Sequence, residues 1–209
     1  MLETTQVLAY VTALGVAAAI PGPGMTALVA RSISGGATVG FTMLTGLILG
    51  DLIYLSLAVF GLALLVQSSS SLFGFISIAS ATYLGWLAWQ FWFYKPKVES
   101  LSEQKTSREL FSAGLSGLAI TLGNPKTIAF YLAILPLVVT LETVSLEVWG
   151  TTLIPLTVAV LVAVGAIFIL GALKVRHILD SEKSQSIMFK GTGVIMLLTS
   201  LSMLAKQFQ

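Results

Sequence analysis

Long runs of apolar residues dominate this sequence, and several of them exceed 18 residues without a charge. A transmembrane helix needs about 20 such residues, because each residue advances about 1.5 Å and the hydrocarbon core is about 30 Å thick. Only 10% of the residues are charged and 56% are hydrophobic. Transmembrane β-strands alternate apolar and polar residues, whereas these runs are continuously apolar. The sequence therefore predicts an all-α integral membrane protein.

The apolar runs predict six transmembrane helices in a single domain that covers residues 1–209. We expect these helices at about 5–31, 38–66, 70–94, 110–139, 147–172 and 187–207. Most of the eleven Lys and Arg residues then fall at connections on one side of the bilayer. Cytoplasmic loops carry such an excess, so both termini are expected outside. A five-span arrangement spoils this segregation of charge and is the less favoured alternative.

The first and fourth predicted helices each contain a proline motif, PGPG at 21–24 and GNPK at 123–126. Proline removes a backbone donor and glycine weakens a helix, so both motifs leave backbone groups unpaired inside the membrane. An ordinary proline kink is the alternative for either motif alone. Two breaks in matching positions predict a 3+3 inverted repeat with broken helices 1 and 4. Repeat 1 is expected at about 1–94, a cytoplasmic loop at 95–109 and repeat 2 at about 110–209.

Two charged residues, Asp51 and Lys126, fall inside predicted spans. A charge at the bilayer centre costs about 2.5–3.5 kcal/mol on insertion scales, so each should face the bundle interior. Each is the obvious electrostatic partner of the other, and pairing would offset part of both desolvation costs. The alternative for Lys126 is snorkelling to an interface. Tyr54 follows Asp51 by three residues on the same helix face, where it can hydrogen-bond the carboxylate or simply pack.

The breaks and the two charges together predict a site for a zwitterion. A helix that restarts after a break presents free N–H groups and a partial positive charge, which suit a carboxylate. The unwound carbonyls on the other side of the break suit an ammonium group. The expected substrate-binding residues are Pro21, Gly22, Pro23, Gly24, Asp51, Tyr54, Asn124, Pro125 and Lys126.

Several other motifs limit the function. Gly46 and Gly50 form a GxxxG pair that is expected to pack the second span against the broken helices or a second subunit. GLSG at 114–117 matches the GxSG of rhomboid-type proteases, but the only histidine, His177, lies in a basic loop. There is no cysteine, and no P-loop or HExxH motif. We therefore expect no cofactor, no metal site and, with a net charge of only +2, no nucleic-acid partner.

In combination, these motifs resemble the LysE/RhtB family of amino-acid exporters. The matching stretches fall in order within residues 17–136, and they are AIPGPGMTALVARSISGGATVGFTMLTGLILGD, ATYLGWLAW and FSAGLSGLAITLGNPKTIAFYLAILP. The resemblance implies a secondary transporter of the bacterial inner membrane that exports amino acids or close derivatives, driven by the proton motive force. By motif it points to Pro21, Gly22, Pro23, Asp51, Asn124, Pro125 and Lys126 as site residues.

We therefore expect an alternating-access exporter and not an enzyme, in which Asp51 meets the substrate ammonium and also carries the coupling proton. A single intramembrane acid favours small neutral amino acids over dibasic ones. The expected partners are the amino acid, protons and the lipid bilayer, and a second copy of the chain is a further candidate. The alternatives from other classes are an intramembrane enzyme of the GxSG type and a passive channel.

Overall fold

The computed structural model is all-helical over the residues that it describes, which confirms the predicted helical class. These residues are 2–20, 22–61, 106–140, 144–176 and 182–207, with single positions between 78 and 93. The helices are α1 (Thr4–Ala19), α2 (Pro23–Val59), α5 (Ser107–Leu122), α6 (Pro125–Ala129), α7 (Leu135–Val138), α8 (Leu146–Val148), α9 (Ile154–Arg176) and α10 (Glu182–Gln207). The π-helical turn η1 (Phe130–Ile134) joins α6 to α7, and the π-helical turn η3 (Trp149–Leu153) joins α8 to α9.

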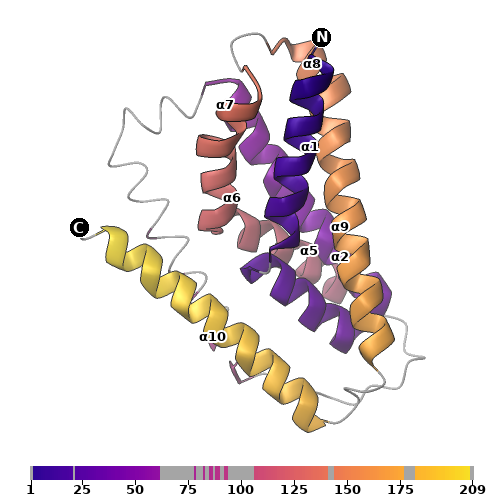
Figure 1. Cartoon of the computed structure of the whole chain (residues 1–209). Coiled ribbons are helices and arrows are strands. Elements are labelled where there is room, and N and C mark those ends of the chain that lie inside the picture. The colour runs from indigo at the N-terminus through magenta and orange to yellow at the C-terminus, as the bar shows by residue number, and fades with distance from the viewer. Residues whose placement is uncertain are drawn as a thin grey trace.

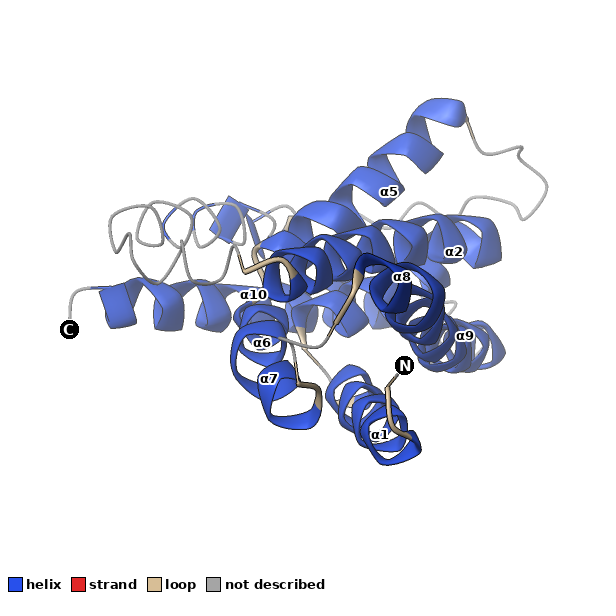
Figure 2. Cartoon of the chain, turned by 90° about the horizontal axis from the view of Figure 1, so that it is seen from above, coloured by secondary structure: helices blue, strands red, loops and turns tan. Residues whose placement is uncertain are grey.

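The helices α1, α2, α5 and α9 form a bundle, and α6 and α7 stand beside α1 (Figure 1). The view from above also places α1 next to the α6–α7 segment, while α10 extends away from the bundle (Figure 2). Within the described chain, Pro23–Val59 and Leu146–Val175 are long and apolar enough to cross a membrane. A third candidate span arises when Ser107–Leu122 and Lys126–Val138 are counted as one bent helix. Most of the predicted third span, 70–94, lies outside the described residues.

The first proline motif breaks the helix where the sequence predicts. Helix α1 ends at Ala19, and Ile20 is extended with φ −67° and ψ 121°. Gly22 is also extended, and Pro23 occupies the first position of α2. Proline suits that position, because the N–H that it lacks would have no partner within the helix. The break therefore separates two helices rather than bending one.

Helix α2 turns sharply at Gly36, where φ is 81°. This left-handed backbone favours glycine, because other side chains clash there. The turn brings Ser32 against Gly40, so closely that a methyl group on Gly40 would collide with the Ser32 hydroxyl. Residues 23–35 and 37–59 are therefore separate helical segments, and the turn lies between the predicted first and second spans, 5–31 and 38–66.

The second proline motif also breaks its helix. Helix α5 ends at Leu122, and Asn124 is the extended N-cap of α6, with Pro125 at its first position. The chain bends by 55° between α5 and the 126–138 stretch. Both motifs thus produce the same local pattern of a helix, a short extended break and a new helix that begins with proline.

Glycines bring α2 and α5 into close contact. A methyl group on Gly46 would collide with the Gly114 carbonyl oxygen, and one on Gly50 would collide with the Thr121 side chain. From the other side, a methyl group on Gly117 would collide with the Met43 carbonyl oxygen. The GxxxG pair therefore packs against the broken helix α5, as expected, and the glycines of the GLSG motif serve the same helix contact.

We predict that Gly46→Ala lowers the stability of the protein by about 1–3 kcal/mol, because the added methyl group forces α2 away from α5. Thermal unfolding of the purified protein in detergent measures this loss. The matched control is Gly171→Ala in α9, where a methyl group meets nothing within 4 Å. Equal unfolding temperatures for the two variants would contradict the close helix contact.

Candidate functional site

A cavity of about 60 Å³ lies between the two helix breaks. Four of the sequence-predicted residues line it: Gly24, Asp51, Asn124 and Lys126. Most of the remaining wall is apolar, from residues such as Leu14, Met25, Leu44, Leu47, Ile48 and Leu161. A space of this size holds a few water molecules. The fold therefore brings Gly24 and Lys126, which are about a hundred positions apart in the sequence, to the wall of one small cavity.

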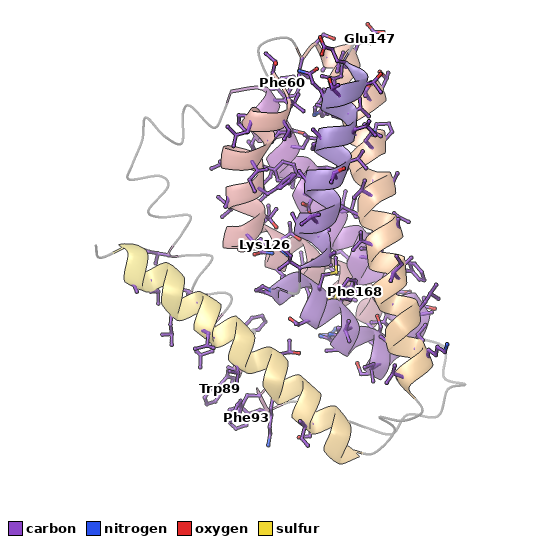
Figure 3. The ribbon with its side chains drawn as sticks, in the orientation of Figure 1. Phe60, Trp89, Phe93, Lys126, Glu147 and Phe168 are labelled. Carbon is purple, nitrogen blue, oxygen red and sulfur yellow. The ribbon has the colours of Figure 1, made fainter. Side chains whose placement is uncertain are left out.

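The ammonium group of Lys126 holds the end of α1. Its Nζ donates hydrogen bonds to the carbonyl oxygens of Ala17 and Ile20, both at 2.8 Å. In an uninterrupted helix, the Ala17 carbonyl would accept from residue 21, but Pro21 has no N–H. Lys126 therefore satisfies a carbonyl that the proline motif leaves without a partner. Figure 3 shows Lys126 where the beginning of α6 meets the end of α1.

Lys126 and Asp51 line the same cavity but make no direct ion pair within the described part of the chain. This differs from the pairing that their charges suggested. The end of α1 offers two carbonyl oxygens and the partial negative charge of a helix C-terminus, so it competes for the ammonium group. Asp51, which is partly buried, keeps its carboxylate for other partners.

The two new helices differ in how their first turns are satisfied. At α6, the Asn124 side chain accepts from the Lys126 backbone N–H at 3.1 Å. At α2, Gly22 supplies no side-chain cap, and the first helical bond is that of Thr26 to Gly22. The N–H groups of Gly24 and Met25 therefore have no partner within the helix, and both residues line the cavity. The N-terminus of α2 is thus less completely capped than that of α6.

Tyr54 supports the second break instead of lining the cavity. Its hydroxyl donates to the carbonyl of Leu122, the last residue of α5, and its ring stacks on Tyr131 with centroids 6.5 Å apart. Tyr131 is fully buried, and its hydroxyl has no hydrogen-bond partner among the described residues. The aromatic group extends through Phe130 to Tyr10.

The other predicted residues occupy the breaks themselves. Gly22 and Pro23 are buried, and a methyl group on Gly22 would lie 3.4 Å from Lys126 Nζ. Pro125 opens α6 through its backbone. Pro21 lies outside the described residues. Sequence reasoning missed Thr121, Thr127 and Phe130 in the cavity wall, and no local motif distinguishes them from ordinary helix residues.

Comparison with known proteins gives one family. The family model described as LysE type translocator matches residues 16–207. An uncharacterised membrane protein of Synechocystis is 31% identical over 68% of each chain. A leucine efflux protein of Klebsiella pneumoniae is 30% identical over 54% of each chain, and a threonine efflux protein of Escherichia coli is 26% identical over 72%. The alignment thus spans about half the length of that leucine efflux protein. No solved structure matches the chain significantly.

We predict that Asn124→Ala lowers the stability by about 1 kcal/mol, because the first turn of α6 loses its side-chain cap. Asn124→Ser, which retains an acceptor at the cap, should lose less. Thermal unfolding of both variants beside the unmodified protein measures the difference. Equal unfolding temperatures for Asn124→Ala and the unmodified protein would show that the cap contributes nothing to this break.

Proposed function

The chain belongs to the LysE type translocator family, and from this membership we propose that it exports amino acids from the cytoplasm. A transporter of this family is not an enzyme. The observation that carries the proposal is the cavity between the two breaks, which is lined both by Asp51 and by the first-turn residues of α2, whose N–H groups have no partner within the helix. These are the complements of the ammonium and carboxylate groups that every amino acid carries.

The substrate carboxylate is proposed to bind at the first turn of α2. The N–H groups of Gly24 and Met25 have no partner within the helix, and the helix end adds a partial positive charge. The corresponding end of α6 is already capped by Asn124. The substrate ammonium is proposed to face Asp51, which makes no ion pair with Lys126. A zwitterion would then span the cavity from α2 to Asp51.

The substrate side chain is proposed to be small and neutral. Leu44, Leu47 and Ile48 from α2 and Leu161 from α9 line the cavity, and aliphatic walls favour an aliphatic group. Two of the relatives are named for the efflux of leucine and of threonine, which agrees with this chemistry. A cavity of about 60 Å³ must widen to admit either amino acid. Binding is therefore tied to a conformational change.

The proposed mechanism is alternating access driven by the proton motive force. Six spans in a 3+3 inverted repeat, with both termini outside the inner membrane, would place the cavity near the bilayer midplane. The matching pattern of the two breaks supports this arrangement. Asp51 is the proposed proton carrier, since its carboxylate lines the cavity and can hold either the substrate ammonium or a proton. An antiporter that assembles as a homodimer is compatible with these features.

We predict that Asp51→Asn abolishes proton-driven export of leucine or threonine in proteoliposomes. The amide keeps the shape of the side chain but has no charge and cannot take up or release a proton. Uptake of labelled amino acid into proteoliposomes, driven by an imposed pH gradient, measures this activity. The control is Glu147→Gln, because Glu147 is an exposed residue of α8 that does not line the cavity and lies well above Lys126 in Figure 3. Full coupled transport in Asp51→Asn would remove Asp51 from the mechanism.

Counterflow separates a carrier from an open pore. Proteoliposomes loaded with unlabelled leucine should transiently accumulate labelled leucine, since a carrier exchanges one molecule for another. A passive channel gives only equilibration. A panel of neutral, acidic and dibasic amino acids in the same assay tests the substrate class, and preference for a dibasic amino acid would contradict the proposed neutral substrate.

A further inference from the structure

The end of α1 holds an ammonium group from another part of the chain. Lys126 Nζ lies 2.8 Å from the Ala17 and Ile20 carbonyl oxygens, and Lys126 belongs to α6, more than a hundred residues away. Two carbonyl acceptors at a helix C-terminus are a cation site by their chemistry, since the helix end also carries a partial negative charge. The site is thus already formed and filled with a primary ammonium group.

The surroundings supply more acceptors than Lys126 uses. The Asp51 carboxylate lines the same cavity as Lys126 and makes no ion pair with it. Ala17 and Ala18 of α1 also line the cavity, so the end of α1 is within reach of a molecule bound there. A second primary ammonium group in the cavity would therefore find both the carboxylate and the α1 carbonyls, if Lys126 withdrew from them.

The backbone of the first break lies directly beside the ammonium group. A methyl group on Gly22 would lie 3.4 Å from Lys126 Nζ and 3.6 Å from its Cε, which is ordinary van der Waals contact. The ammonium group therefore lies between the end of α1 and the residue that precedes α2.

We propose that the carbonyl oxygens of Ala17 and Ile20 form a binding site for a primary ammonium group, which Lys126 occupies in the empty protein and which the substrate ammonium takes over on binding. The inference rests on the proposed export of amino acids and adds an exchange of cations to it. The exchange leaves the α1 carbonyls satisfied throughout. The released Lys126, which lies beside Gly22, then faces the substrate carboxylate at the first turn of α2, and this carboxylate can replace the lost carbonyl contacts.

The exchange predicts competition between Lys126 and a simple amine. We would titrate the purified full-length protein in lipid nanodiscs with 3-methylbutylamine, which carries the leucine side chain and an ammonium group but no carboxylate. Isothermal titration calorimetry compares the unmodified protein with Lys126→Met. The variant should bind the amine about tenfold more tightly, as expected if Lys126 leaves the site open only about a tenth of the time. The neutral analogue 3-methylbutanol should show no such gain.

Two variants serve as controls. Lys126→Arg keeps a cation that can donate to both carbonyls, so its amine affinity should stay near that of the unmodified protein. Lys174→Met removes an exposed ammonium group from α9 and should change nothing. Amine binding by Lys126→Met that is no tighter than in the unmodified protein would overturn the site. A gain in affinity for the alcohol as large as the gain for the amine would overturn it as well.

A folding defect in Lys126→Met would itself test the proposal. The variant would then be purified in the presence of the amine or of the alcohol, and the folded fraction measured by size-exclusion chromatography. A folded fraction that is recovered with the amine but not with the alcohol supports the ammonium site. A folded fraction that is the same with both ligands overturns it. Leucine export by the unmodified protein is measured separately. If the protein exports leucine but Lys126→Met does not bind the amine more tightly, only the ammonium site is rejected. If Lys126→Met binds the amine more tightly but the protein does not export leucine, only the proposed function is rejected.

Discussion

The hydrogen bonds from Lys126 to Ala17 and Ile20 join the two breaks of this molecule into one site. A proline motif at the end of α1 leaves backbone carbonyls without donors in a region where lipid cannot provide any. The ammonium group reaches them from the first turn of α6, which the second proline motif creates. The first break therefore supplies carbonyl acceptors, and the second supplies the ammonium group that donates to them. The cavity with Asp51 in its wall lies where these two ends meet.

Close packing of α2 on α5 fixes where the two breaks lie relative to each other. The glycines of both helices allow backbone contact, with Gly46 against Gly114 and Gly117 against Met43. Asp51 follows this contact directly on α2, and Tyr54 continues it by donating to the last carbonyl of α5. Small residues thus place the carboxylate beside the second break without a side chain between the helices.

Much of the fold follows from local sequence, and parts of the site do not. The apolar runs predict helices, and the prolines at 21, 23 and 125 predict where two of them break, because proline lacks an N–H whatever surrounds it. The turn at Gly36 falls in the connection that the predicted spans 5–31 and 38–66 leave between them, although no motif singled out this glycine. The role of Tyr54 was missed. Its distance from Asp51 along the helix suggested a bond to the carboxylate, but the Leu122 carbonyl lies in reach.

The sequence by itself determined the helical membrane class, both breaks and the identity of the charged residues between them. Each of these depends on composition or on the covalent structure of proline and glycine, which do not change with context. Only the tertiary structure decided which acceptor Lys126 takes and which helix end stays open. The ammonium group had Asp51, the α1 carbonyls and the membrane surface as alternatives. Distances between helices select among such partners, and those distances arise only when α1, α2, α5 and α6 pack together.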